Sequence, residues 1–171
     1  RDIETAQIGI QSSLTGHLVL STVHTNSAVA AITRLRDMGI ESFLLASSLR
    51  TIISQRLVRR LCSHCKTENK PSAESVSIFG LDKNKSIFSA KGCDHCNHTG
   101  YQGRIAIAEC IQIDKTLKDL IHNNASENEI SDYVFEDNQS IDKASINLIV
   151  GGVTSCEEII RVNNIKEDAS I

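Results

Sequence analysis

The chain of 171 residues is predicted to form an α/β fold that contains a cysteine-rich insert and ends in helices. Three observations predict this. Apolar residues recur at helical spacing on both sides of a short run rich in strand formers, His17 to Val23. Two Cys-x-x-Cys pairs, at 62–65 and 93–96, then interrupt the pattern. Beyond them, one alternating segment is followed by helical segments that begin with capping residues, which indicates a mostly helical end.

The N-terminal part is expected to run helix, strand, helix, helix. Asp2 to Leu14 has helical periodicity, and Thr15-Gly16 is a plausible stop. Residues 17–23 are apolar and flanked by helices, so we expect a buried strand of an open sheet. Further helices are predicted over Ser27–Met38, before Gly39, and from Ser42 to about Leu57.

The C-terminal part is expected to hold one strand and four helices. Alternation predicts the strand over Arg104–Ile113. The predicted helices are Leu117–His122, Ile141–Val150 and two that begin at capping boxes, Ser126 to Glu129 and Ser155 to Glu158. The polar residues 163–171 are expected to fray. Along the chain we divide the protein into a core segment 1–60, a metal-binding segment 61–103 and a strand-plus-helix segment 104–171.

The two cysteine pairs predict a structural zinc site. Each pair brings two thiolates together, and four thiolates complete a closed tetrahedral shell, here Cys62, Cys65, Cys93 and Cys96. The gap from Lys66 to Gly92 is longer than usual and has few large hydrophobic residues. We therefore expect the metal to hold this segment folded. The alternatives are two disulfides or redox-active thiols.

Composition excludes several classes of function. The net charge of −3 and the pI near 6.1 give no general case for nucleic-acid binding. No apolar run is long enough to span a bilayer. Six cysteines, four of them in metal spacing, fit a reducing compartment. The other two, Cys110 and Cys156, lie in apolar periodic segments and are expected to be buried.

His24 is the leading candidate for chemistry outside the cysteines. It follows the expected strand, where ligands gather in open sheets, and Asn26 or Ser27 can cap the next helix, whose N-terminus favours phosphate. Ordinary turn and cap chemistry is the alternative. Arg104 follows two glycines and can approach a phosphate closely, although a solvated arginine is the commoner case. No G-x-x-x-x-G-K-[ST] phosphate loop is present.

The other charged residues are typical of solvated surface positions. His17, taken alone, is more often a surface histidine than a ligand. Arg34 lies on a predicted helix. Arg56, Arg59 and Arg60 form a basic cluster before the first cysteine pair, and we expect a solvated face there.

Several motifs together resemble the secretion ATPase superfamily, the motors of type II secretion and type IV pilus assembly. They are Arg1 to Ala6, Thr15 to Asn26, Thr33 to Gly39, Gln55 to Cys62, both cysteine pairs, and Cys96 to Arg104. The resemblance weakens between Lys66 and Lys91 and in the last eight residues. It is strongest to the type II secretion ATPases of the general secretion pathway protein E family, and the tetracysteine insert is shared with pilus-extension ATPases.

The resemblance implies the C-terminal part of a RecA-like P-loop ATPase domain that begins just after Walker B. It implies catalytic roles for His24, Arg1 and Arg34 and nucleotide contacts from His17, His24 and Arg104. ATP and Mg²⁺ would be bound by the longer polypeptide. This chain by itself, which lacks Walker A, is expected to be inactive.

The resemblance also implies partners and a place in the cell. It implies a homo-hexamer in the cytoplasm that powers type II secretion by coupling ATP hydrolysis to pseudopilus assembly. Contact with the inner membrane would be peripheral and made through secretion platform proteins, and no nucleic acid would be bound. The alternatives are a type IV pilus-extension ATPase, a zinc-ribbon module that binds protein without hydrolysis, and a thiol redox protein.

Overall fold

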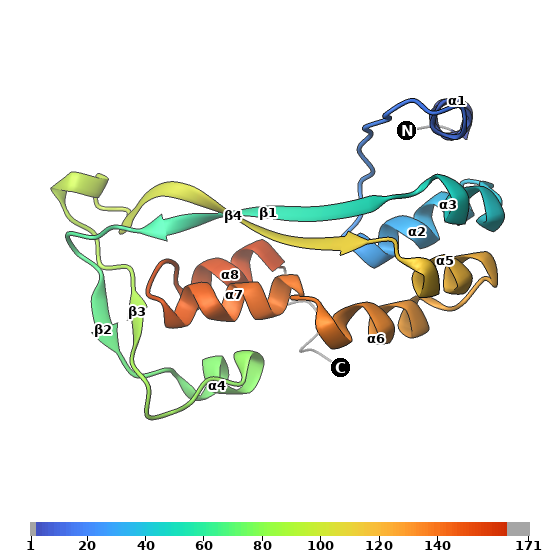
Figure 1. Cartoon of the computed structure of the whole chain (residues 1–171). Coiled ribbons are helices and arrows are strands. Elements are labelled where there is room, and N and C mark those ends of the chain that lie inside the picture. Colours follow the sequence, from blue (N-terminus) through green and yellow to red (C-terminus); the bar gives the residue numbers. More distant parts are fainter. Residues whose placement is uncertain (1–2, 164–171) are drawn as a thin grey trace. The chain divides into compact units, whose positions relative to one another are not determined.

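A computed structural model of the chain describes residues 3–163, except for the side chain at position 137 (Figure 1). Its residues divide into two units. Unit 1 comprises Arg1–Ser54 and Glu109–Gln139, and unit 2 comprises Gln55–Ala108 and Ser140–Ile171. Two long strands, β1 (Thr51–Leu61) and β4 (Tyr101–Gln112), pair with each other and run through both units. The chain therefore enters and leaves the cysteine segment through one pair of strands.

The strand β1 occupies residues that are predicted to be helical. The sequence predicts one helix from Ser42 to about Leu57, but the helix α3 covers only Ser42–Ser48 and β1 begins at Thr51. Thr51, Ile52 and Ile53 are β-branched, and such side chains are stiff in a helix and fit a pleated strand. Burial alternates over residues 51–58 of β1, with the even-numbered residues less exposed, as a half-buried strand requires, and the alternation shifts at Arg59.

Unit 1 contains five helices among its described residues. They are α1 (Ile3–Leu14), α2 (Ala28–Asp37), α3, α5 (Lys115–His122) and α6 (Glu127–Asp137). Side chains of Ser27, Asp114 and Ser126 cap α2, α5 and α6. The apolar faces of these helices bury a continuous core with the end of β4, including Ile32, Leu45, Ile111, Leu117, Ile121 and Ile130. The predicted helices at the start of the chain, at 27–38 and at 117–122 are thus confirmed within one or two residues.

The predicted buried strand at residues 17–23 is wrong. Residues 17–25 have no regular secondary structure, and the side chains of Leu18 and Leu20 are 89% and 87% exposed. A strand needs a neighbour to receive its N–H and C=O groups. In the part of the chain that the structure describes, strands pair only as β1 with β4 and β2 with β3. Propensity alone therefore does not fold this segment.

Unit 2 holds the cysteine segment and the last two helices. The short strands β2 (Thr67–Asn69) and β3 (Ile87–Ser89) are antiparallel, with Thr67 opposite Ser89. The helix α4 (Ala73–Phe79) lies between them in sequence, and η1 (Asp94–Cys96) follows. The helices α7 (Ile141–Val150) and α8 (Cys156–Asn163) complete the unit and confirm the predicted helices there.

The gap between the cysteine pairs is better anchored than its composition indicates. Phe79, Leu81 and Ile87 are each less than 10% exposed and join a core with Val58, Ile107, Ile149 and Ile159. Few hydrophobic residues suffice because their neighbours come from α7, α8 and the long strands rather than from the gap itself. The segment therefore has an apolar anchor in unit 2 in addition to the expected metal.

A buried ion network corrects the expected solvated face at Arg56, Arg59 and Arg60. Glu158 is 1% exposed, and its carboxylate accepts hydrogen bonds from the Arg59 and Arg161 guanidinium groups at 2.6–2.9 Å. The Arg59 guanidinium also lies 4.1 Å from the centre of the Tyr101 ring. Arg56 donates to the Val162 carbonyl at 3.0 Å. Two of the three arginines thus tie β1 to α8.

The capping boxes and the isolated cysteines have mixed outcomes. Ser126 and Glu129 form the predicted box at α6. Ser155 accepts from the Glu158 N–H at 3.3 Å, but the carboxylate of Glu158 belongs to the arginine network. Cys156 is buried as predicted, whereas Cys110 points outward from β4 and is exposed.

Of the polar tail, residues 164–171 lie outside the described residues. No described helix is both long enough and apolar enough to cross a membrane.

Candidate metal centre and nucleotide-contact residues

The four cysteines of the two pairs meet at one point in unit 2. All four Sγ atoms lie within 4.8 Å of one another. Cys62 and Cys93 are 4.0 Å apart at sulfur, and Cys96 lies 3.8 Å from both Cys65 and Cys93. Cys62 and Cys65 lie in the turn that follows β1, Cys93 caps η1, and Cys96 ends η1. The fold thus brings together ligands separated by about thirty positions in sequence.

The geometry of the four sulfurs fits one tetrahedral zinc ion. With Zn–S bonds of about 2.3 Å, neighbouring sulfurs of a tetrahedron lie about 3.8 Å apart. Three of the six separations, at 3.8–4.0 Å, match this edge length, and the other three are below 4.8 Å. A disulfide would need an S–S distance of about 2.05 Å, and all six cysteines are free. The four-cysteine shell leaves no open position, so a metal held there would be structural.

The backbone around the second pair is shaped to carry these ligands. Asn97 and His98 both adopt positive φ, at 49° and 61°, which folds the chain back over the sulfurs. A Cβ on Gly100 would lie 2.6 Å from the Cβ of Ala90, and one on Gly92 would lie 2.6 Å from the His98 carbonyl. Glycine is therefore required at both positions, because any side chain would collide with the neighbouring loop.

Backbone N–H groups support the sulfur of Cys96. The N–H groups of Cys93 and Gly100 donate to Cys96 Sγ at 3.3 and 3.2 Å. Burial raises the pKa of the Cys96 thiol, but these bonds and the neighbouring thiols lower it more, to about 6. Burial instead raises the pKa of Cys65 to about 12. Hydrogen bonds from backbone N–H groups to a thiolate are typical of the groups that surround and orient a metal ligand.

The metal-binding segment is fastened to the end of α7. Lys66, next to Cys65, donates to the Gly152 carbonyl at 2.8 Å and lies 4.5 Å from the centre of the Phe88 ring. Gly152 has a φ of 64°, and a Cβ there would lie 2.5 Å from Phe88. These contacts fix the β2–β3 hairpin against the α7–α8 turn within unit 2.

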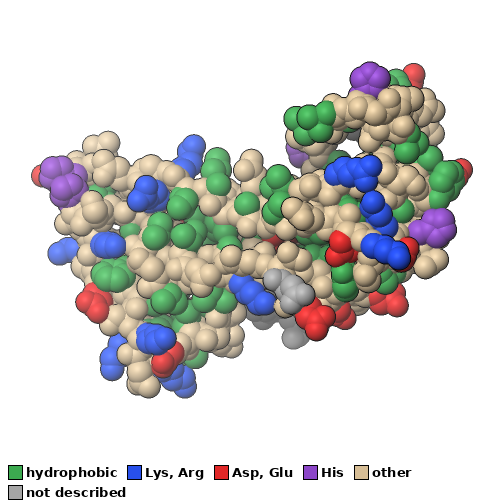
Figure 2. Space-filling view, viewed as in Figure 1, with side chains coloured by type: hydrophobic (Ala, Val, Ile, Leu, Met, Phe, Trp, Pro, Cys, Tyr) green, Lys and Arg blue, Asp and Glu red, His purple; other side chains and the backbone are tan. Residues whose placement is uncertain are grey.

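The nearby histidines are not needed as ligands. His64 and His95 are exposed and stack on each other, with ring centres 4.1 Å apart. His98 pairs with Asp94 at 3.1 Å. Figure 2 shows histidine side chains at the surface of this end of unit 2. Four sulfurs already complete the shell, so these imidazoles leave the proposed coordination unchanged.

The predicted nucleotide-contacting residues are exposed where they are described. His24 lies in the irregular segment 17–25, and Arg34 lies in the last turn of α2. The Nδ1 atom of His17 lies 3.1 Å from Thr15 Oγ1 and 3.3 Å from the Ser12 carbonyl, at the end of α1. Arg104 is on β4 in unit 2. Arg1 lies outside the described residues.

The N-terminus of α2 is already occupied by the protein's own side chains. Ser27 accepts from the Ala30 N–H at 3.0 Å, and Glu109 accepts from the Ala28 N–H at 2.6 Å. The expectation that this helix end offers free N–H groups to phosphate is therefore wrong for those two donors. Sequence reasoning missed Glu109. Its signal is the alternation of β4, which places this acid on the same inward face as Ile107 and Ile111.

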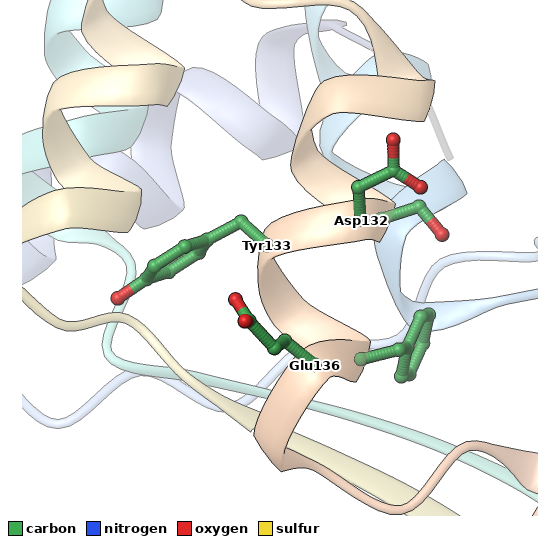
Figure 3. Close-up of a pocket in the computed structure, with 5 residues that line it drawn as sticks. Asp132, Tyr133 and Glu136 are labelled. Carbon is green, nitrogen blue, oxygen red and sulfur yellow. The ribbon is translucent and has the colours of Figure 1, made fainter.

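A shallow pocket on α6 does not include any of these residues. It is lined by Ser131, Asp132, Tyr133, Phe135 and Glu136, all from one helix (Figure 3). The Tyr133 hydroxyl donates to Asp114 at 2.7 Å, so one lining group already has a partner. A hollow formed by a single helix surrounds a ligand poorly, and we assign it no function.

Comparison with known proteins identifies the family. The family described as "Type II/IV secretion system protein" matches residues 1–161. The chain belongs to this family. It is 47% identical to the type II secretion system ATPase E of Vibrio cholerae and 46% identical to the type II secretion system protein E of Pseudomonas aeruginosa. Each match covers 95% of this chain and 33% of the relative. The chain thus spans about a third of the length of these relatives.

Solved structures confirm the fold. The pilus retraction motor PilT with bound ADP matches 95% of this chain and 37% of its own, with a TM-score of 0.64 and 21% identity. The ATPase DotB of Legionella pneumophila matches 99% of this chain and 37% of its own, with a TM-score of 0.61 and 18% identity. The chain therefore has the fold of part of a RecA-like ATPase domain, with a tetracysteine insert and a helical end, as the sequence resemblance implied.

Proposed function

We propose that this chain is part of a hexameric ATPase that powers type II protein secretion by coupling ATP hydrolysis to pseudopilus assembly. The observation that carries the proposal is the 47% identity to a type II secretion system ATPase over 95% of the chain. The longer polypeptide would supply the phosphate loop and bind ATP and Mg²⁺. It would work in the cytoplasm and reach the inner membrane only through platform proteins, without nucleic acid.

The proposed chemistry is charge stabilisation during phosphoryl transfer. Such reactions depend on positioning and on donors directed at the γ-phosphate oxygens. His24 is exposed, so its imidazole is available to a nucleotide. The segment that carries it is followed by α2, which fixes the C-terminal end of that segment. We assign it the γ-phosphate contact, with His17 assisting. Arg1, Arg34 and Arg104 would add positive charge near the nucleotide or across the subunit interface.

The proposal assigns a role to each of the three segments of the chain. Segment 1–60 would belong to the ATPase core, 61–103 to the metal-binding subdomain and 104–171 to a C-terminal subdomain. Zinc would stabilise the second segment without taking part in hydrolysis, since its shell is closed. A zinc-binding module without an enzyme is less favoured, because similarity to ATPases extends over unit 1 as well as the cysteines.

ATP turnover by the longer and the shorter polypeptide tests the proposal. A longer polypeptide that also contains a phosphate loop should hydrolyse ATP with Mg²⁺ and assemble into a hexamer by native mass measurement. The chain of 171 residues alone should show no turnover, because nothing in it holds magnesium and triphosphate together. Steady hydrolysis by the highly purified short chain, or none by the full-length hexamer, would contradict the proposal. Loss of pilus extension rather than secretion in a deletion strain would assign the motor to a type IV pilus.

A further inference from the structure

Glu109 is a buried acid that the proposed mechanism does not use. It is 4% exposed, and it lies on the inward face of β4 between Ile107 and Ile111. Burying a carboxylate among apolar neighbours is costly unless donors compensate it. One such donor is the Ala28 N–H, 2.6 Å from Glu109 Oε1, at the first residue of α2. Both residues belong to unit 1, so the contact lies within one unit.

This contact anchors the backbone just beyond His24. The irregular segment 17–25 is exposed, so few side-chain contacts fix its course. On its C-terminal side, Thr25 Oγ1 donates to the Ser27 carbonyl at 3.0 Å, and the Ala28 N–H is held by Glu109. The Glu109 contact is therefore four residues from His24, at the start of the ordered helix. A displacement of α2's first turn would move His24 with it.

The charge of Glu109 also matters at this position. The N-terminus of a helix carries partial positive charge and attracts anions. A carboxylate already bound there leaves the Ala28 N–H unavailable to a phosphate oxygen. The side chain of His24, rather than the end of α2, is then the group presented to the nucleotide.

We propose that Glu109 is a positioning residue for nucleotide hydrolysis, which holds the first turn of α2 and thereby the backbone that presents His24. This inference rests on the proposed function of His24. It predicts that Glu109 affects turnover through His24 and has no contact with nucleotide of its own.

A double-mutant cycle in the full-length hexamer tests the link to His24. Glu109→Ala should lower kcat by about tenfold or more and change KM for ATP little, since the residue acts on geometry. Added to His24→Ala, it should cause almost no further loss, because the group it positions is already gone. Glu109→Gln keeps an oxygen acceptor of the same length and should recover much of the turnover. Effects of the two alanine variants that multiply would overturn the proposal.

Hydrogen exchange gives a readout independent of turnover. In Glu109→Ala, amides of residues 24–30 should exchange faster, while those of α6 should not change. The control is Glu129→Ala, which removes the carboxylate at the α6 N-terminus and should alter α6 only, with kcat unchanged. Unchanged exchange at 24–30 in Glu109→Ala overturns the positioning role even if ATPase activity falls. If the His24→Ala variant hydrolyses ATP normally, the assigned His24 contact and the effect of Glu109 on turnover both fail, although faster exchange in Glu109→Ala would still establish the anchor at α2.

Discussion

The tetracysteine module, residues 62–103, and the His17–Thr25 segment differ in where their stabilising partners lie. The module has its four sulfurs within 4.8 Å and places Phe79, Leu81 and Ile87 in the unit 2 core. The segment leaves Leu18 and Leu20 almost fully exposed. A chelate site needs a few ligands brought together by short turns, whereas a buried strand needs neighbouring strands along its whole length. Short motifs therefore establish the first region, and apolar composition does not establish the second.

The largest effect should follow removal of a metal ligand. Cys93→Ser should abolish zinc binding and unfold much of residues 62–103, since structural zinc contributes on the order of 10 kcal/mol. Unit 1 should remain folded. Zinc analysis of the wild type should give about one ion per chain, and hydrogen exchange should show the loss confined to unit 2. Cys110→Ser is the control, because Cys110 is exposed on β4. Wild-type protein without stoichiometric metal would contradict this expectation.

Substitution of His24 should give the next largest effect and tests the exposed segment. In the full-length protein, His24→Ala should lower kcat about 10²–10³-fold, equivalent to about 2–4 kcal/mol, because one donor to the developing charge is lost. His17→Ala should lower it less, since His17 interacts with Thr15 and Ser12 at the end of α1. Steady-state kinetics with thermal unfolding decides between this role and a turn residue. Near-normal kcat per folded chain would reject the contact.

Loss of Glu158 should destabilise unit 2 by about 2 kcal/mol, because Glu158→Ala leaves the Arg59 N–H and two partly exposed guanidinium groups without their acceptor. The neighbouring Glu157 is exposed, so Glu157→Ala should change stability by less than about 0.5 kcal/mol. Urea unfolding of both variants measures the difference. Equal stabilities would show that the network adds little to unit 2.

The same network predicts a pH dependence. Burial raises the pKa of Glu158, but hydrogen bonds from Arg161 and Arg59 lower it more, from the usual 4.5 to about 2. Because the folded pKa lies below the unfolded one, this stabilisation is complete above about pH 5 and is lost as the pH falls toward 2. The stability difference between wild type and Glu158→Gln should therefore shrink between pH 5 and pH 2. A difference that stays constant would argue against an ionised Glu158.

The smallest effect is expected for alanine substitutions at two glycines of the module. Comparing them separates a steric clash of the added Cβ from backbone strain. Gly100 and Gly103 have similar φ values of 77° and 74°, but only at Gly100 would a Cβ meet an atom within 4 Å, the Cβ of Ala90. Gly103→Ala should cost about 1 kcal/mol through backbone strain alone. Gly100→Ala should cost more and weaken zinc retention, since the Gly100 N–H supports Cys96. Zinc release under a chelator measures this, and equal rates for the two variants would contradict it.

Local motifs predicted the parts of this protein whose partners lie close in sequence. The cysteine spacing indicated the four ligands, and capping residues indicated the starts of α2 and α6. Such signals succeed because a turn or a helix end is satisfied within a few residues. The family resemblance predicted the RecA-like fold over nearly the whole chain, which the solved structures confirm.

Tertiary structure decided what depends on distant partners. Only the fold shows that Glu109 meets Ala28 across 81 positions, that Glu158 meets Arg59 across 99, and that Phe79 has a core to enter. It also decided that residues 51–57 form a strand and that residues 17–23 do not. Apolar residues specify that a segment prefers burial. Which segment is buried, and in which conformation, depends on the surfaces that the rest of the chain supplies.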